Sequence, residues 1–186
     1  MEFDRKLMAV ISPWEPSDRV AEAYMLRGAI LASFAHIEQC LSELAIRASY
    51  APEYDSIASD HDSLPFTMSK RVRFLKRIAG TAGPLGPYSS LLQSVLKRWE
   101  KTKDLRDQMA HAHMSVLPNA PVRFSGIKPD GGEIHMVWSN YFSPALTNAA
   151  LRAARFSRAC QRIRDKFEAQ QLLPTFEDAR IHHEGR

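Results

Sequence analysis

An arginine and a histidine stand close together in the stretch 105–111, which reads Leu-Arg-Asp-Gln-Met-Ala-His. The guanidinium of Arg106 can hold two phosphate oxygens at once, and the imidazole of His111 titrates close enough to neutrality to move a proton. Such a pair suits the cleavage of a phosphodiester without a metal ion. Because shuffling this composition gives roughly two such spacings by chance, the surrounding elements must support the interpretation.

Proline positions predict the helices that would carry this pair. The eleven prolines leave four proline-free windows with apolar residues at helical spacing, namely 17–51, 66–83, 88–117 and 145–173. Ser17 is the expected N-cap of the first helix, Thr67 opens the second and Gly80 ends it. The buried stripe of the first helix is expected to include Tyr24. Arg106 and His111 fall near the C-terminal end of the third helix.

A different pattern separates the third and fourth windows. Val122 and Phe124, then Ile134, Met136 and Trp138, alternate with other residues around the turn sequence Pro-Asp-Gly-Gly. This pattern predicts a β-hairpin at about 121–139. The predicted fold is mainly α, a bundle of four to five helices with a small β-hairpin inserted before the last long helix. We expect a single domain over 1–173, a loose C-terminal tail over 174–186, and Trp99 and Trp138 in the core.

Composition points to a cytoplasmic protein. Hydrophobic residues make up 45% and charged residues 25% of the chain, as in soluble globular proteins. The sequence has neither an apolar run of membrane-spanning length nor a signal-peptide layout near Met1, so no membrane partner is expected. Cys40 and Cys160 both fall in helical patterns and are expected to be small buried hydrophobes rather than a disulfide.

Charge is distributed unevenly along the chain. Residues 1–62 carry five basic and eleven acidic residues, a net of −6, whereas residues 63–186 carry twenty basic and ten acidic residues, a net of +10. The asymmetry indicates a polyanion-facing half, with solvated helix faces as the plain alternative. The candidate RNA-binding residues are Lys70, Arg71, Arg73, Lys101, Arg155, Arg158 and Arg162.

With this layout the chain resembles the HEPN superfamily of α-helical domains, many of which are RNases of toxin–antitoxin, antiviral and RNA-processing systems. The family signature is an arginine, usually a polar residue, three to five further positions and a histidine, and Arg106, Asp107 and His111 match it. A long first helix with an internal glutamate, here Glu38, and a basic second helix from Lys70 to Arg77 are also similar to many members. The resemblance covers roughly residues 17–171.

The resemblance implies a metal-independent endoribonuclease whose two motifs face one cleft in a homodimer. In that chemistry a 2′-hydroxyl attacks the adjacent phosphorus and leaves a 2′,3′-cyclic phosphate. His111 would move the proton, Arg106 would stabilise the growing charge, and Glu38 would orient Arg106. Asp107 would hold the imidazole or face water. The expected setting is a toxin or antiviral-defence effector kept silent by an antitoxin or regulatory protein, with no cofactor and no metal.

A second histidine, His113, also fits the longer gap of the signature. On an ideal helix five residues rotate about 140° and seven about 340°, so His113 would share the face of Arg106 while His111 would not. The resemblance favours His111, because an alanine and a histidine after a hydrophobic residue are the commoner family form. Some members carry a modifiable tyrosine where this chain has His113, so that regulation is not predicted.

Two other functions fit the same residues. A catalytically silent HEPN-like module would bind RNA, nucleotide or a partner protein and would use Arg106 only in an ion pair with Glu38. A purely architectural helical dimerisation module would leave the basic faces incidental. In either case His111 and His113 would interact favourably with the C-terminal end of a helix dipole.

Overall fold

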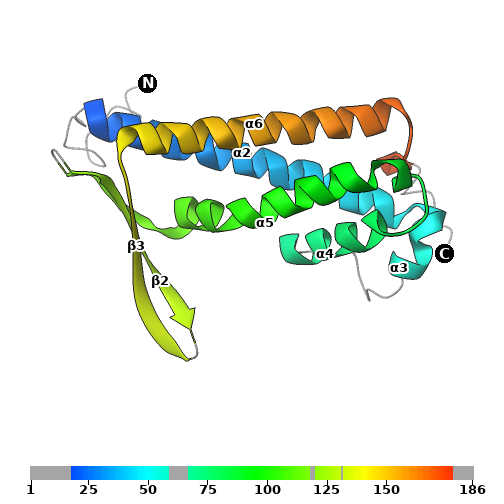
Figure 1. Ribbon diagram of the computed structural model, residues 1–186, viewed down its shortest axis with the longest axis horizontal. Helices are drawn as coiled ribbons and strands as arrows, with labels where there is room; N and C mark the ends of the chain where they lie inside the picture. The colour runs from blue at the N-terminus through cyan, green and yellow to red at the C-terminus, as the bar shows by residue number, and fades with distance from the viewer. Residues whose placement is uncertain (1–17, 59–66, 118–119, 131, 178–186) are drawn as a thin grey trace, which may run out of the picture.

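Three long helices run side by side along the longest axis of the molecule (Figure 1). The computed structural model describes residues 18–58, 67–117, 120–130 and 132–177. The long helices are α2 (Asp18–Ser49), α5 (Ser89–His111) and α6 (Ser143–Ala169). A shorter helix, α4 (Met68–Ala79), packs against α2 and α5, and the remaining helical pieces are η1 (Pro52–Tyr54), α3 (Asp55–Ala58) and η2 (Gly86–Tyr88).

These five α-helices, with a small antiparallel sheet before α6, confirm the predicted fold class. The sheet has the order β1 (His113–Ser115), β2 (Val122–Asp130) and β3 (Glu133–Tyr141). The sequence predicted the hairpin β2–β3 but not β1, which is too short to show an alternating pattern. The hairpin is also longer than predicted, because its strands continue to Asp130 and Tyr141.

The core lies where α2 is enclosed by the other helices. Its buried residues recur every three or four positions, which is the spacing of one helix face. Phe34 of α2 meets Trp99 of α5 edge-on, with ring centroids 6.2 Å apart. The burial of Trp99 confirms its predicted place in the core. Cys40 and Cys160 are free and buried, as predicted, and burial raises the pKa of the Cys160 thiol to about 12.

The opposite side of α2 is left exposed by the other described elements, which makes the prediction for Tyr24 wrong. This side chain is 57% exposed, because none of the described elements packs over the outward side of the first turns of α2. Its neighbours on this surface are also exposed and uncharged. We call this surface the α2 outer face, and its residues are Ala21, Tyr24, Met25, Gly28, Ala32 and Ala35.

By length and composition alone, α2 could cross a membrane. The central helix of a folded core has the same properties, and the inner side of α2 is buried in this way. A signal sequence passes the same test, and 39% of the apolar window of α2 is buried, so the finding by itself is weak evidence for a membrane span.

The predicted helix ends agree with the structure where they can be compared. Thr67 caps α4 by accepting a hydrogen bond from the Lys70 backbone N–H, at 3.3 Å, and Gly80 is its C-cap. Ser17, the predicted cap of α2, lies outside the described residues.

The chain after α6 is held at its beginning, since buried Arg47 donates hydrogen bonds to the carbonyls of Leu173 and Pro174. The predicted loose tail is thus wrong at Pro174, and residues 178–186 lie outside the described part of the chain.

The hairpin projects from the bundle at the end where α5 finishes (Figure 1). Directly opposed residues of paired strands point to the same side of a sheet. The inner side of the hairpin carries Val122 and Phe124, which are buried against the bundle. The other side carries Trp138, which is 63% exposed, so its predicted place in the core is wrong. Alternation predicted the strand but not which of its two sides meets the helices.

Candidate functional site

Arg106 and Glu38 form a two-pronged ion pair between α5 and α2. The Nε–H of Arg106 donates to Oε1 of Glu38 at 2.6 Å, and its Nη2 donates to Oε2 at 3.3 Å. The two side chains are 30% and 25% exposed. The structure therefore brings together the two residues that the sequence linked across 68 positions of chain, at a place that solvent and a ligand can reach.

Asp107 completes the surroundings of the guanidinium. Its Oδ1 accepts a hydrogen bond from Nη1 of Arg106 at 3.0 Å, and its side chain is 60% exposed. The hydrogen bond to Glu38 is the main cause that raises the pKa of Arg106, so this side chain stays charged. Bonds to the described residues occupy three of its five N–H donors, and Nη1 and Nη2 each keep one for a ligand.

A polar chain supports the helix turn that carries Glu38. The hydroxyl of Ser42 donates to the Glu38 carbonyl at 2.5 Å, and Nη1 of Arg71 in α4 donates to that hydroxyl at 2.6 Å. Arg71 is half-buried in this role. The structure thus places this candidate RNA-binding residue in a contact between α4 and α2, rather than on the open surface with Lys70 and Arg73.

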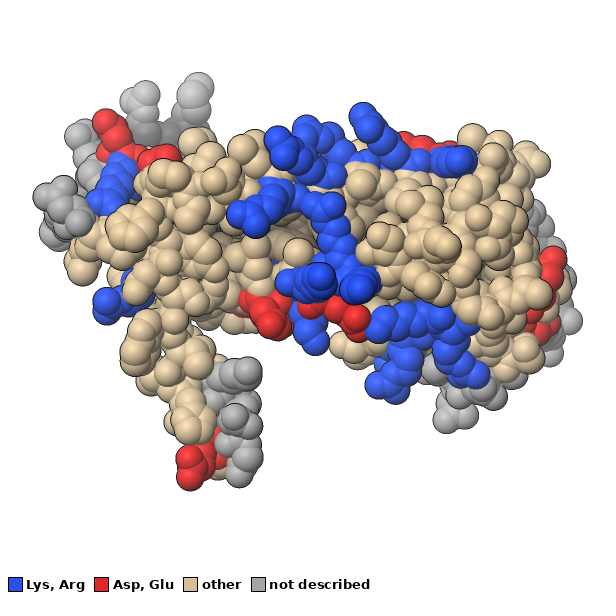
Figure 2. Space-filling model, viewed as in Figure 1, with Lys and Arg blue, Asp and Glu red and all other residues tan. Residues whose placement is uncertain are grey.

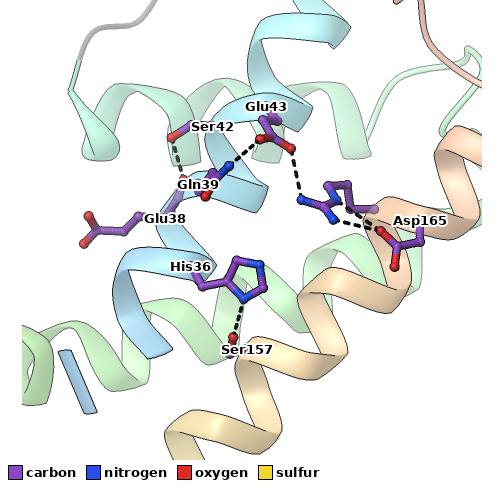
Figure 3. A network of polar contacts seen from close by, with 8 residues as sticks. His36, Glu38, Gln39, Ser42, Glu43, Ser157 and Asp165 are labelled. Carbon is purple, nitrogen blue, oxygen red and sulfur yellow. Dashed lines mark hydrogen bonds and ion pairs between the residues drawn. The ribbon is translucent and has the colours of Figure 1, made fainter. Parts of the chain in front are cut away.

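A second network, between α2 and α6, holds the other side of α2. Figure 3 shows His36 and Glu43 reaching towards α6 while Glu38 extends in the opposite direction. Nδ1 of His36 lies 2.9 Å from the Ser157 hydroxyl, and Arg164 pairs with Glu43 at 3.4 Å. Because these contacts fix the rotation of α2 about its axis, they direct Glu38 towards α5.

Arg27 anchors the end of α5, and sequence reasoning missed it. Its Nε–H donates to the Met109 carbonyl at 2.7 Å, and its Nη2 donates to the Ala112 carbonyl at 3.1 Å. The guanidinium also lies 5.9 Å from the ring centre of Phe124 in β2. Carbonyls at a helix C-terminus lack partners within the helix, and a cation there satisfies them. The available signal was a charged residue close to the apolar stripe of the first predicted helix.

The two candidate histidines belong to different elements. His111 is the last residue of α5, and Ala112 after it is extended, with φ −76° and ψ 143°. His113 begins β1, so the prediction that it shares a helical face with Arg106 is wrong. Both histidines are exposed. Within the described residues, neither one hydrogen bonds to Arg106, Glu38 or Asp107.

His111 lines a groove between the end of α5 and the hairpin. The groove has a volume of about 640 Å³. Its polar lining includes Asp104, Asp107 and Gln108, and its apolar lining includes Leu105 and Val137. Tyr141 donates its hydroxyl proton to the side-chain carbonyl of Gln108 at 2.9 Å and so joins the two walls. The groove places His111 beside a space large enough for part of a nucleotide.

Basic side chains form a band on the face shown in Figure 2. Lys and Arg side chains extend there from α6 over α5 to α4, interrupted by a few acidic ones. Arg98 of α5 lies 5.0 Å from the ring centre of Phe156 in α6, which joins two of these helices. We call the exposed basic residues of the three helices the basic band; they include Lys70, Arg73, Lys97, Arg98, Lys101, Arg152, Arg155, Arg158 and Arg162.

The described residues contain no group of three or more His, Cys, Asp or Glu side chains that could hold a metal ion. Comparison with known proteins assigns no family, since no family model, curated protein or solved structure matches this chain. Inferences about function therefore depend on the geometry of the site itself.

Proposed function

We propose that this protein is a metal-independent endoribonuclease of the HEPN type, with Arg106 and His111 as its catalytic residues. The observation that carries the proposal is the guanidinium of Arg106, which Glu38 holds by two hydrogen bonds while it keeps two free donors. A charged, preorganised fork of this kind suits the two non-bridging oxygens of a phosphodiester. His111 ends the same helix about one and a half turns later and borders an open groove.

The proposed reaction is a transesterification within the RNA. The 2′-hydroxyl loses its proton and attacks the adjacent phosphorus, the bond from phosphorus to the 5′-oxygen breaks, and that oxygen gains a proton. The products are a 2′,3′-cyclic phosphate and a 5′-hydroxyl end. His111 serves as base or acid in these transfers, and Arg106 stabilises the charge that grows on the non-bridging oxygens.

The same proposal includes a homodimer in which both copies contribute to one cleft. Each His111 would then act beside the Arg106 of the second copy, because the two side chains of one chain lie about 140° apart around α5. The uncharged and uncovered α2 outer face supports association, since exposed apolar surfaces of this kind mark contact sites. The basic band supports RNA as the substrate. A cytoplasmic effector that an antitoxin or regulatory protein holds silent remains the proposed setting.

The proposal is tested by incubating purified protein with a structured and an unstructured RNA in EDTA. We expect cleavage by the wild type, with products that carry cyclic phosphate ends. Arg106→Ala and His111→Ala should each lower the rate at least about 100-fold, the size of a lost proton-transfer or charge-stabilising group. His113→Ala, and His135→Ala at an exposed position of β3, are the matched controls and should retain most of the activity.

A well-folded wild type that cleaves none of several RNAs would contradict the nuclease. The second candidate would then apply, a catalytically silent module that binds RNA, nucleotide or a partner protein. The contact that favours it is the same ion pair, because Arg106 already has a carboxylate partner. In that case Arg106→Ala would lower the melting temperature without changing the affinity for RNA.

A further inference from the structure

The hairpin presents an apolar surface to solvent. Ile127 is opposite Met136 in the β2–β3 register, so these two residues and Ile134 and Trp138 lie on the same outward side. These four side chains are between 63% and 75% exposed. We call this surface the arm face. A protein of this size rarely leaves four large apolar side chains together in water unless they meet a partner.

The edge of the hairpin is open as well. β3 ends the strand order of the described sheet, so its outer row of backbone N–H and C=O groups has no strand beside it. From Ile134 to Asn140 the only titratable side chain is that of His135, which points to the inner side of the hairpin. Proteins usually protect such an edge with lysine, proline or a covering element. Here β3 carries no charged side chain on its outward side, and the charged residue on that side of the hairpin is Arg123 of β2, which bonds to Asn140.

A matching surface exists on the bundle. The α2 outer face carries two large exposed side chains, Tyr24 and Met25, followed by Gly28, Ala32 and Ala35. The residues Met25, Gly28, Ala32 and Ala35 follow spacings of three and four, so they form one shallow stripe along the helix. Small side chains let another element approach closely. The large arm-face residues and this shallow stripe are complementary in size.

Charge and area together identify the partner. The basic band lies on α4, α5 and α6, whereas the arm face and the α2 outer face are themselves uncharged, with Arg123 as the basic side chain beside the arm face on the outward side of the hairpin. An apolar protein surface therefore fits these two surfaces better than the phosphates of RNA do. A large apolar side chain has a surface of about 200 Å². The six large side chains of the two surfaces therefore expose on the order of 800 Å², which is the area that one partner buries in a stable dimer of standard size.

We propose that a second copy of this chain covers both surfaces. The arm face of each copy packs on the α2 outer face of the other, so the two contacts are equivalent by twofold symmetry. This inference specifies how the dimer of the proposed nuclease associates. It does not depend on catalysis, since each contact is apolar and is read out by association alone.

The arm also connects association with the candidate site. Gly126, Ile127, Val137, Ser139 and Tyr141 of the hairpin line the groove that contains His111, so Ile127 belongs both to the arm face and to the groove lining. A partner seated on the arm face would contact Ile127 directly and would hold the other four residues in place from the other side of the strands. Formation of the dimer would therefore fix one wall of the groove.

The first test measures association by sedimentation over about 1–100 µM protein, a range that brackets the micromolar dissociation constants of weak dimers. We expect a dimer for the wild type, and a dissociation constant at least about 30-fold weaker for Met136→Glu and for Trp138→Glu, as for truncated interface anchors. The matched control is His135→Glu, which adds the same charge to the inner side of the same strand. It should stay dimeric, and all three variants should keep the wild-type circular dichroism.

A second test identifies the two surfaces directly. Met25→Cys combined with Met136→Cys should form a disulfide between chains on mild oxidation, while Met25→Cys combined with Ser90→Cys, on an exposed turn of α5, should not. The natural cysteines are buried and do not compete. A wild type that stays monomeric, or arm variants that remain dimers, would overturn the inference. RNA cleavage by such a monomer or variant dimer would leave the nuclease proposal standing.

Discussion

At the scale of a single residue, Arg106 has two roles to combine, since it pairs with Glu38 and, in the proposed nuclease, also binds a phosphate. Its ion pair with Glu38 is about one-quarter to one-third exposed, so solvent screening limits the net stabilisation to about 1 kcal/mol or less. Because this ion pair contributes so little to the stability of the fold, weakening it when a phosphate binds to Arg106 would cost little free energy. In the proposed nuclease Glu38 is a positioning residue that holds the plane of the Arg106 guanidinium, whose two remaining N–H donors are left for a phosphate.

Replacing Glu38 with glutamine tests this division. The amide keeps the size of the side chain and one hydrogen-bond acceptor, but it removes the charge and the two-pronged grip. We expect Glu38→Gln to change the melting temperature by less than about 4 °C, the shift for about 1 kcal/mol in a domain of this size. The cleavage rate at saturating RNA should fall at least about 10-fold.

Comparison with Arg106→Lys shows whether Glu38 positions the guanidinium for catalysis or only stabilises the contact between α2 and α5. Lysine retains the charge but not the fork, so its activity should be as low as that of Arg106→Ala. If Glu38→Gln cleaves RNA at the wild-type rate, the carboxylate serves only the contact between helices.

Single residues also show where prediction from sequence succeeds. A glutamate at the margin of an apolar helix stripe needs a partner, and Arg106 on the stripe of another helix was the available one. The end of α5 could not be found in this way, because Ala112 and His113 do not interrupt a helical pattern. The helix stops at His111 because β1 pairs with β2, a contact set by residues far along the chain.

At the scale of elements, Arg27 links three parts of the fold. It reaches from α2 to the last carbonyls of α5 and lies against Phe124 of β2. These contacts set the position of His111 relative to Arg106, since they determine where the last turn of α5 finishes. The geometry of the candidate site therefore depends on a residue that hydrogen bonds to neither Arg106 nor His111.

Replacing Arg27 with methionine removes the two charged hydrogen bonds and keeps most of the apolar stem. Such bonds contribute about 1.5–3 kcal/mol each when a charged donor is involved, so losing the two bonds should lower the free energy of unfolding by at least about 3 kcal/mol. Urea titration measures it. RNA cleavage should fall at least about 10-fold at a temperature where the variant is folded.

Arg155→Met is the control for Arg27→Met, because it makes the same substitution at an exposed position of α6. It should change stability by less than about 0.5 kcal/mol. Equal stability of the two variants would contradict the role of Arg27 as an anchor of α5.

Prediction at this scale was uneven for a physical reason. Helical periodicity and proline positions identify the four long or medium helices, since each buries one continuous stripe. The side of the hairpin that meets the bundle and the strand β1 depend on tertiary contacts instead. Trp138 was assigned to the core because large aromatic residues usually lie there, whereas its register opposite Ser125 turns it outward.

At the scale of the whole molecule, positive charge and apolar surface are separated. The basic band covers α4, α5 and α6 (Figure 2), while the arm face and the α2 outer face are uncharged. One surface therefore suits a polyanion and the other suits a protein. The charge asymmetry predicted from the sequence is consistent with this division, although composition could not show which faces carry it.

The salt dependence of the affinity for RNA tests whether the basic band contacts phosphates. Each phosphate contact contributes about 0.7 to the slope of log affinity against log salt for a single strand. We expect Arg158→Gln to lower the slope by about that amount and to weaken binding similarly for all sequences. Arg123→Gln, which removes the same charge from the hairpin, should leave the slope unchanged. If neither substitution changes the slope of log affinity against log salt, RNA does not contact the basic band at Arg158.

The packing of the first long helix on the last one also determines when this protein can fold. α2 shares its most extensive helix contact with α6, which begins only at Ser143, and Arg47 of α2 binds the backbone at Leu173 and Pro174. At the usual speed of synthesis, α2 emerges from the ribosome on the order of ten seconds before α6. During that interval its apolar inner side has no α6 to cover it, so the burial of this side is completed only after α6 has been synthesised.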